Sequence, residues 1–331
     1  ASVSTLAYKN IEVKITSNEG TNLYGIYTKP HNGQVIAHII LISGSGPQDR
    51  NGALLGHEPF LIISDRLTKA GYAVLRVDDR GAGQSEGDHN AARLQDFEDD
   101  THAAIDFIKK FESGKNIKIL LIGHSMGGIL GPKIASQRND VQGVIALAGP
   151  TLRGDQLMLL QKELIETKMG FPDQIVKMAN DSFKKLYATL LEPHENLDNA
   201  KIALARTAQD VFKMLPENQL NMIVNQLTVP WLYDMIRLDP KDYLTQLTKP
   251  ALFLFGGKDL QVPSFQNNEL VLTYLNKAGN TQFTTHIFEG LNHLFQHCET
   301  GLPTEYASIE QTFSEEVIDK MIFWMGSVFG K

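Results

Sequence analysis

Runs of consecutive apolar residues alternate with amphipathic segments along most of the chain, and this alternation predicts its secondary structure. Apolar runs without a polar face are typical of parallel strands that are covered on both sides. We expect strands at 35–42, 72–77, 117–122, 141–148, 251–255 and 283–288. Segments with helical periodicity lie near 58–70, 93–112, 126–137, 265–278 and 309–329. Strands that alternate with helices predict a doubly wound, mostly parallel sheet, in which ligands bind beyond the carboxyl ends of the strands.

Two segments depart from this alternation. The first 30 residues alternate apolar and polar positions on both sides of a turn at 18–20, which predicts an N-terminal β-hairpin. From 151 to 228 the pattern is helical throughout and contains no strand. We therefore expect a core made of 1–150 and 229–331, interrupted by an all-helical cap, or lid, at 151–228 over the carboxyl-end face of the sheet.

The apolar residues in and just after the expected cap are candidates either for core packing or for a substrate pocket. Its methionines recur at helical spacing, at Met158, Met169, Met178, Met214 and Met222. Such spacing is typical of core packing, and an adaptable apolar pocket is the alternative. Trp231, just beyond the cap, is the candidate for a substrate pocket.

Composition and charge argue against a nucleic-acid partner, a disulfide and a multi-cysteine metal site in this protein. The chain has 331 residues, of which 42% are apolar and 21% charged, enough for a sizeable core. Its 31 Lys and Arg residues against 38 Asp and Glu residues give a net charge of −7, and no basic run is present. Nucleic-acid binding needs a concentrated basic surface, so we expect no nucleic-acid partner. With a single cysteine, Cys298, we expect neither an intramolecular disulfide nor a multi-cysteine metal site.

The longest apolar run, 35–42, is interrupted by His38 and falls far short of the roughly 18–20 apolar residues of a membrane-spanning helix. We therefore expect a soluble protein without a transmembrane segment. The first residues lack a basic region followed by an apolar one, so we expect no signal peptide. Because the sequence starts at Ala1, the cytoplasm and export with the signal already removed, for example to a bacterial periplasm, both stay open. The oligomeric state is open as well.

Two pentapeptides match the pattern Gly-x-Ser-x-Gly, one centred on Ser85 and one on Ser125. The pattern exposes a nucleophilic serine when it forms a sharp turn between a buried strand and a helix. Ser125 has both flanks, because the apolar run 119–122 precedes it and a glycine-rich helix start at 127–130 follows. Ser85 lies in a polar loop without a helix start. We therefore expect Ser125 to be a nucleophile and Ser85 to be a turn serine.

A serine hydroxyl needs a base that takes its proton and an acid that orients the base. For a nucleophile at a strand–turn–helix junction, the acid and then the histidine are expected later in the chain. Asp259 follows a predicted strand directly, whereas its rivals Asp234 and Asp239 have no strand before them. Capping of the next helix is the structural alternative for Asp259. His293 follows the last predicted strand at loop distance and is the expected base.

His297 is the alternative histidine, and with His293 and Cys298 it forms a small cluster in the sequence. No metal-binding frame such as Cys-x-x-Cys or His-Glu-x-x-His supports a metal site there. We therefore expect no metal, and we expect His297 to be a helix or surface histidine.

The oxyanion that forms on a carbonyl needs two backbone N–H groups aimed at it. One is expected from Met126, the residue after the nucleophile. The other is expected from the loop at 43–47, whose glycines allow amides to turn inward. Ser45 is the expected donor and Gly46 the alternative. A phosphate-binding loop is the competing interpretation, but the Gly-x-x-x-x-Gly-Lys pattern is absent and Pro47 has no N–H to offer.

Taken together, these motifs resemble the α/β-hydrolase family. The resemblance rests on the pentapeptide at 123–127, the acid segment at 254–263 and the histidine segment at 290–293. The loop at 79–85 is similar to a structural loop common in that family. More narrowly, the loop at 44–50 is similar to the oxyanion loop of a branch of bacterial esterases and serine-peptidase-like proteins.

Residues 230–231 and 238–240 also resemble that branch. The sequence departs from the family at Ser43, where the oxyanion loop usually has histidine. The resemblance extends from about residue 10 to residue 330. It implies the α/β-hydrolase fold with an inserted helical cap. It also implies a serine hydrolase that needs no cofactor and commonly acts on esters.

The expected function is therefore hydrolysis of a small-molecule carboxylic ester through an acyl-enzyme, as in carboxylesterases. Ser125 is the expected nucleophile, His293 the proton carrier and Asp259 the acid that orients it. These three residue types do not distinguish an ester from an amide, so a serine peptidase or aminopeptidase is an alternative, and an acyltransferase is another. A non-catalytic binding protein on the same fold is disfavoured by the intact serine, aspartate and histidine order.

Overall fold

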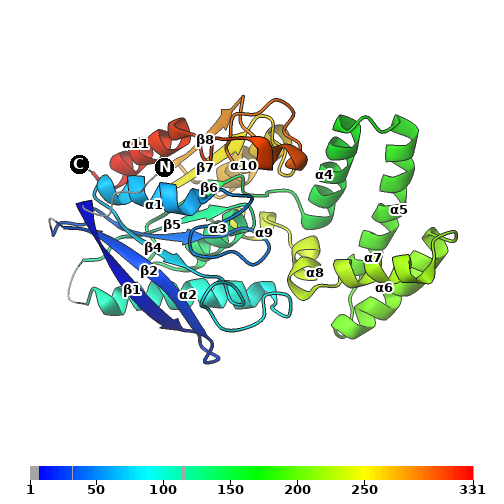
Figure 1. The fold of residues 1–331 in the computed structure, drawn as a ribbon, viewed down its shortest axis with the longest axis horizontal. Coiled ribbons are helices and arrows are strands. Elements are labelled where there is room, and N and C mark those ends of the chain that lie inside the picture. Colours follow the sequence, from blue (N-terminus) through cyan, green and yellow to red (C-terminus); the bar gives the residue numbers. More distant parts are fainter. Residues whose placement is uncertain (1–6, 32, 114–115, 331) are drawn as a thin grey trace. The chain divides into compact units, whose positions relative to one another are not determined.

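The computed structural model describes residues 7–31, 33–113 and 116–330. Within these residues the central feature is a mixed sheet of eight strands (Figure 1). The strands are β1 (Tyr8–Thr16), β2 (Asn22–Pro30), β3 (His38–Ile42), β4 (Ala73–Val77), β5 (Ile119–His124), β6 (Gly143–Leu147), β7 (Ala251–Gly256) and β8 (Phe283–Phe288). Their order is β1-β2-β4-β3-β5-β6-β7-β8. β1 and β2 form an antiparallel hairpin, and β4, β3 and β5 to β8 run parallel. The predicted mostly parallel sheet with an N-terminal hairpin is confirmed.

Burial follows the sequence pattern of these strands. Every residue of β3, β6 and β7 is buried, as expected for strands covered on both faces. The helices of this unit are α1 (Pro59–Lys69), α2 (Leu94–Phe111), α3 (Gly127–Gln137), α9 (Lys241–Leu244), α10 (Ser264–Lys277) and α11 (Glu315–Phe329). Figure 1 shows α1 and α11 on one side of the sheet and α2 on the other. In the described part of the chain, no helix combines the length and apolar character that crossing a membrane requires.

The C-terminal helix begins later than we predicted from 309–329. A short 3-10 helix, η2 (Pro303–Ser308), and an extended segment precede it, and α11 starts at Glu315. Phe313 is buried in the segment before the helix. An apolar pattern alone does not distinguish such a buried loop residue from the first turn of a helix, which explains the misplaced start.

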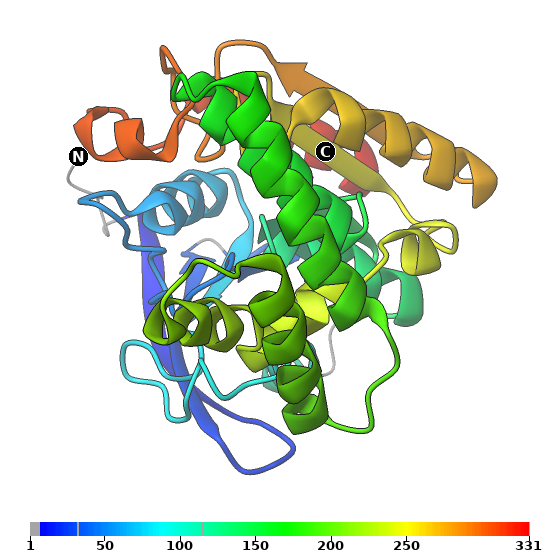
Figure 2. The ribbon, with the colours of Figure 1, turned by 90° about the vertical axis from the view of Figure 1, so that its right-hand side faces the viewer.

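Five consecutive helices form a second compact unit. They are α4 (Gly154–Lys168), α5 (Asp173–Leu191), α6 (Leu197–Val211), α7 (Glu217–Leu227) and α8 (Pro230–Arg237). α4 packs on α5, α5 on α6 and α6 on α7, and α8 packs on both α4 and α5 (Figure 2). Buried side chains that include Leu186, Leu190, Leu204 and Ile236 give this unit a core of its own. In the sequence, the unit interrupts the sheet between β6 and β7.

The limits of this helical unit differ from the predicted 151–228, since it comprises Asn90–Asp96 and Leu152–Asp239. Thr151 belongs to the sheet unit because its N–H and its Oγ–H bind Asn267 of α10, each at 2.8 Å. At the other end, the unit extends beyond 228 because α8 packs on α4 and α5.

Two contacts within the helical unit explain its other limits. The Arg93 guanidinium donates to the carboxylate of Asp234 at 2.9 and 2.5 Å, which draws the segment before α2 into this unit. The Gly154 N–H donates to the Leu238 carbonyl at 2.9 Å, so the chain enters and leaves the unit at neighbouring points. A role of the unit as a lid stays a prediction.

The methionines of the helical unit contradict the predicted core packing. The exposed fractions of Met169, Met178, Met214 and Met222 range from 53% to 94%. Met158 is the exception, because it packs against the core of the unit. Leucine, alanine and tyrosine side chains on the inner helix faces fill that core instead, so helical spacing alone did not identify the buried face.

Candidate active site

Ser125 lies in a sharp turn between β5 and α3, at the carboxyl edge of the sheet. Its φ angle is 56°, in the left-handed region that non-glycine residues seldom adopt. The turn is held because the Ser125 N–H donates to the Leu147 carbonyl at 2.9 Å and its carbonyl accepts from Gly128 N–H at 2.8 Å. This backbone presents the hydroxyl beyond the strand, as the motif predicts.

Glycines on both sides of Ser125 allow the strand and the helix to approach closely. A Cβ on Gly123 would overlap the Gly127 carbonyl, and one on Gly127 would overlap the Ile42 carbonyl of β3. α3 begins at Gly127, so the positive end of its dipole faces the turn. Negative charge that develops beside Ser125 is therefore stabilised by the local fold.

His293 lies between β8 and η2, and its ring faces Ser125. The distance from His293 Nε2 to Ser125 Oγ is 3.1 Å, and that from Nδ1 to Asp259 Oδ2 is 2.7 Å. The Asp259 carboxylate accepts a hydrogen bond from the Nδ1–H group, which leaves Nε2 free to accept the serine hydroxyl proton. His293 is 4% exposed and Asp259 3%, so water competes little for these bonds.

Asp259 faces His293 and holds the turn after β7, but it does not cap the next helix, because the N-cap of α10 is Pro263 and has no side-chain hydrogen bond. Its Oδ1 accepts from the N–H groups of Gln261 and Val262 at 2.8 and 2.9 Å, while Oδ2 faces His293. The turn after β7 thereby fixes the carboxylate. The rival Asp234 pairs with Arg93 inside the helical unit.

Two further residues hold His293, and the sequence analysis missed both. The His124 ring lies 2.9 Å, through Nε2, from the His293 carbonyl. Burial, together with the neighbouring His293, lowers the pKa of His124 to about 3, so the ring is neutral and donates this hydrogen bond. Asn292 is fully buried and accepts from the N–H groups of Leu294 and Gln296, each at 3.0 Å. His124 sits inside the recognised pentapeptide, which was the available signal.

The loop after β3 lies beside the nucleophile. A Cβ on Gly44 would come within 3.2 Å of the Ser125 Cβ. Met126 is buried at the N-cap of α3, whereas Ser45 is exposed. Throughout 7–31, 33–113 and 116–330, the N–H groups of Met126, Ser45 and Gly46 have no protein acceptor. The two expected donors, Met126 and Ser45, and the alternative Gly46 are therefore available to a ligand.

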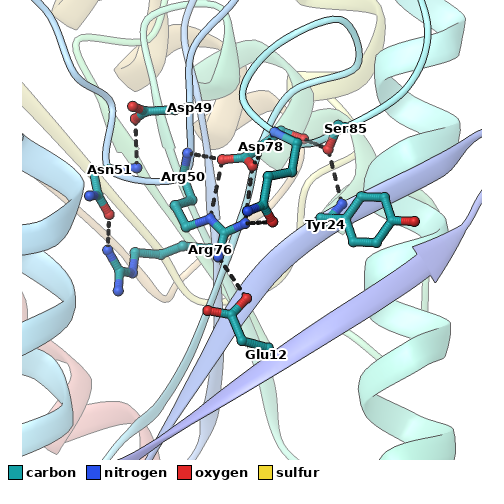
Figure 3. Close-up of polar contacts among 9 residues, drawn as sticks. Glu12, Tyr24, Asp49, Arg50, Asn51, Arg76, Asp78 and Ser85 are labelled. Atoms are coloured by element: carbon teal, nitrogen blue, oxygen red, sulfur yellow. Dashed lines mark hydrogen bonds and ion pairs between the residues drawn. The ribbon is translucent and has the colours of Figure 1, made fainter.

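Ser85 occupies a different environment from Ser125. Its hydroxyl donates to the Asp78 carbonyl at 2.7 Å and accepts from Tyr24 N–H at 3.0 Å (Figure 3). Both partners are backbone groups, and the bond from Tyr24 of β2 ties the loop to the hairpin. No histidine is among them.

The remaining predicted positions lie outside this constellation. Trp231 is half-buried in α8 of the helical unit, and its place in a substrate pocket stays a prediction. His297 binds Gln311 through its N–H and ring, and its side chain is 61% exposed. Within the described residues, no three His, Cys, Asp or Glu side chains group as metal ligands would.

Comparisons with known proteins give a consistent picture of the fold. The esterase EstD of Thermotoga maritima is 26% identical over 315 residues, which cover 95% of this chain and 67% of that protein. An esterase of Pyrococcus furiosus has a TM-score of 0.61 at 17% identity and covers 100% of this chain and 96% of its own. A proline iminopeptidase of Mycobacterium smegmatis has a TM-score of 0.56 at 16% identity, covering 96% of this chain and 99% of its own.

The family comparison covers most of the chain. The model of the family described as serine aminopeptidase, S33, matches residues 60–299. This range contains Ser125, Asp259 and His293 together with the helical unit. The chain thus belongs to the serine aminopeptidase S33 family of α/β hydrolases.

Proposed function

We propose that this protein cleaves carboxylic esters of small molecules through an acyl-enzyme, with Ser125 as the nucleophile. One observation carries the proposal: Ser125 Oγ, His293 and Asp259 form a continuous chain of contacts at 3.1 and 2.7 Å. This order of hydroxyl, imidazole and carboxylate activates a serine for attack on a carbonyl carbon.

The first half of the reaction forms the acyl-enzyme. Ser125 Oγ attacks the ester carbonyl carbon while His293 Nε2 takes the hydroxyl proton. The carbonyl oxygen becomes an oxyanion, which accepts from the N–H groups of Met126 and Ser45. The intermediate then expels the alcohol, which receives the proton from His293, and the acyl group stays on Ser125.

The second half reverses these roles with water. His293 takes a proton from a water molecule, whose oxygen attacks the acyl carbon. Collapse of the second tetrahedral intermediate releases the carboxylic acid and returns the proton to Ser125. In both halves Asp259 stabilises the imidazolium of His293 and fixes the tautomer of its ring.

A peptidase or aminopeptidase is the second candidate, since the family description and the proline iminopeptidase neighbour both point to amide bonds. An aminopeptidase needs a carboxylate that receives the free amine of its substrate. Two acids of the helical unit are already paired: Asp155 with Arg153 at 2.5 Å, and Glu166 with Lys162 at 2.5 Å. The other candidate acids of this unit, Glu163 and Asp173, lie at spacings natural for a solvated helix face, so within the described helical unit no assembled amine-binding site supports a substrate with a free amino terminus.

The test compares kcat/KM for p-nitrophenyl butyrate with kcat/KM for a series of aminoacyl p-nitroanilides on one preparation. We expect the ester to react far faster, because an amine leaves only when His293 protonates it. Anilide turnover within about tenfold of the ester, a barrier difference of about 1.4 kcal/mol, favours the peptidase. Product partitioning in the presence of an added alcohol separates hydrolysis from acyl transfer.

The helical unit supplies substrate selection in this proposal, with Trp231 as the pocket residue. Its half-buried indole offers a large apolar surface with one polar N–H. Trp231→Ala is expected to change the relative kcat/KM values of short and long acyl esters. A uniform change across the series removes Trp231 from the pocket.

A further inference from the structure

The loop at 43–48, which we call the oxyanion loop, starts next to two successive carboxylates. β3 and β4 are parallel neighbours in which Ile40 pairs with Leu75. The residues that follow the two strands, Ser43 after β3 and Asp78 after β4, therefore leave the sheet side by side at its carboxyl edge. This register brings the acids of one loop to the backbone of the other.

Asp79 binds both ends of the oxyanion loop. Its Oδ1 accepts from the Ser43 hydroxyl at 2.5 Å, and its Oδ2 accepts from Gln48 N–H at 2.9 Å. Its own N–H donates to the Gln48 carbonyl at 3.0 Å. Three hydrogen bonds from one residue thus fix the positions where the loop begins and ends.

Asp78 continues this support beyond the loop. Its carboxylate accepts from the Arg50 N–H at 2.6 Å and from the Arg50 guanidinium at 3.1 and 3.2 Å (Figure 3). The Gln84 N–H adds a bond at 3.0 Å. Arg50 also reaches Glu12 of β1 at 2.9 Å, so the segment after the loop is anchored to the hairpin.

The Asp79 carboxylate occupies an unfavourable place for a charge. It lines a cavity of about 60 Å³, together with apolar side chains that include Ile42, Met126 and Leu130. Burial raises the pKa of Asp79 to about 7, against the opposing effect of its bonds from Ser43 and Gln48. A buried carboxylate with a raised pKa lowers the free energy of unfolding at neutral pH. Both of its oxygens nevertheless accept hydrogen bonds from the oxyanion loop.

We propose that Asp79 is a positioning residue for hydrolysis, which holds the oxyanion loop so that the N–H of Ser45 faces the reacting carbonyl. The link to the nucleophile is short, because Gly44 lies against the Ser125 Cβ and Ser43 is the residue before it. This inference rests on the proposed function, since it assigns the loop to the oxyanion.

The proposal predicts which kinetic constant changes. The loop N–H is needed most when the carbonyl oxygen carries a full negative charge, so its displacement affects the transition state more than the bound ester. Loss of Asp79 should therefore lower kcat while KM changes little. Removal of one complete oxyanion donor typically costs about a hundredfold or more, and a displaced donor costs part of that.

The experiment measures kcat and KM for p-nitrophenyl butyrate, and the affinity for an aryl trifluoromethyl ketone, in Asp79→Ala, Asp79→Asn and Ser43→Ala. All rates are normalised to the fraction of protein labelled at completion by a fluorophosphonate. For Asp79→Ala we expect kcat to fall by about tenfold to a hundredfold, and the ketone affinity to fall in parallel. Asp79→Asn, which keeps an acceptor for Gln48, should restore part of the loss. Ser43→Ala should show a smaller decrease.

Asp65→Ala is the matched control, because Asp65 is a half-buried acid of α1 that accepts from Tyr8 at 2.8 Å and does not touch the oxyanion loop. The proposal is overturned if the normalised kcat of Asp79→Ala equals that of Asp65→Ala. It is also overturned if KM in Asp79→Ala rises by the same factor as kcat falls. If Asp79→Ala does not fold, Asp79→Asn and Ser43→Ala decide by the same criteria. Wild-type protein that cleaves anilides but not the ester contradicts the proposed ester function, while the ketone series still tests the role of Asp79.

Discussion

Ser85 and Ser125 occupy the same five-residue pattern, yet the fold gives them opposite surroundings. Ser125 follows a buried strand and precedes a helix, with His293 at 3.1 Å from its hydroxyl. Ser85 lies in a loop where its hydroxyl donates to the Asp78 carbonyl at 2.7 Å. A hydroxyl that already donates to a backbone carbonyl contributes to the loop's stability rather than to chemistry.

The difference shows that a motif acquires chemistry from partners supplied by distant parts of the chain. His293 and Asp259 reach Ser125 from the loops after β8 and β7. Tyr24 and Asp78, which hold Ser85, offer backbone groups only. Four predictions, in descending order of expected effect, test this contrast.

The largest effect is expected from removing each hydroxyl in turn. Ser125→Ala should reduce ester hydrolysis by about 10⁴-fold or more and abolish fluorophosphonate labelling, since the variant loses the hydroxyl that lies 3.1 Å from His293 Nε2. Ser85→Ala should retain both within a few fold, because its hydroxyl binds only backbone. Steady-state rates and labelling of the two variants check this, and labelling that persists in Ser125→Ala would end the assignment of the nucleophile.

The acid should show the next largest effect. Asp259→Asn is expected to keep the fold but lower kcat by about 10³- to 10⁴-fold, because a neutral amide neither fixes the tautomer nor stabilises imidazolium. Asp234→Asn is the matched control, since Asp234 pairs with Arg93 in the helical unit. A greater loss of kcat in Asp234→Asn than in Asp259→Asn contradicts the assignment.

The last glycine of each pentapeptide, Gly127 or Gly87, should contribute differently to the free energy of unfolding. A methyl group on Gly127 would overlap the Ile42 carbonyl, so Gly127→Ala is expected to cost about 3 kcal/mol in free energy of unfolding. Gly87 has φ of +97°, and a Cβ there would meet the Arg80 Cβ at 3.3 Å, far less severe than the overlap at Gly127, so Gly87→Ala should cost only about 1–2 kcal/mol. Chemical denaturation measures both, and equal costs would contradict the tight packing around Ser125.

The smallest expected effect is a dependence of stability on pH that originates at Asp79, the start of the loop that carries Ser85. The folded protein holds the pKa of Asp79 at about 7, above the value of about 3.9 for an unfolded chain. The folded state therefore binds the proton more tightly, and this stabilisation is complete below about pH 4 and lost as the pH rises through 7. Relative to Asp79→Asn, the wild-type melting temperature should fall between pH 5 and pH 8. A difference between the two melting temperatures that does not vary with pH contradicts the shifted pKa.

Most of the fold follows from the hydrophobic pattern, for a physical reason. Strands buried on both faces require nearly unbroken apolar runs, and the fully buried β7, Ala251–Gly256, lies within one residue of the predicted 251–255. Elements whose membership depends on long-range packing were placed less well. α8 belongs to the helical unit through contacts with α4 and α5, and Phe313 is buried outside any helix. Neither contact leaves a local periodicity in the sequence.

The candidate site divides in the same way. The sequence identified Ser125, Asp259 and His293 because strand ends carry these residue types, and the structure brings their side chains together. The polar groups that hold them in place were not predicted. Asp79 and His124 both lie in segments that the motifs singled out, but they act through hydrogen bonds to loops far away in the sequence, and a motif does not indicate such partners.

The bond between Gly154 and Leu238 has a consequence for how this protein can diversify. Because the two ends of the helical unit meet there, the segment between them starts and finishes at one place. The entropic cost of closing such a segment grows only logarithmically, by about 0.6 kcal/mol for each doubling of its length. Helices between these two residues can therefore be lengthened, shortened or exchanged at little cost to the sheet. The junction thus allows the helical unit to change in length while the strands before and after it, β6 and β7, keep their places in the sheet.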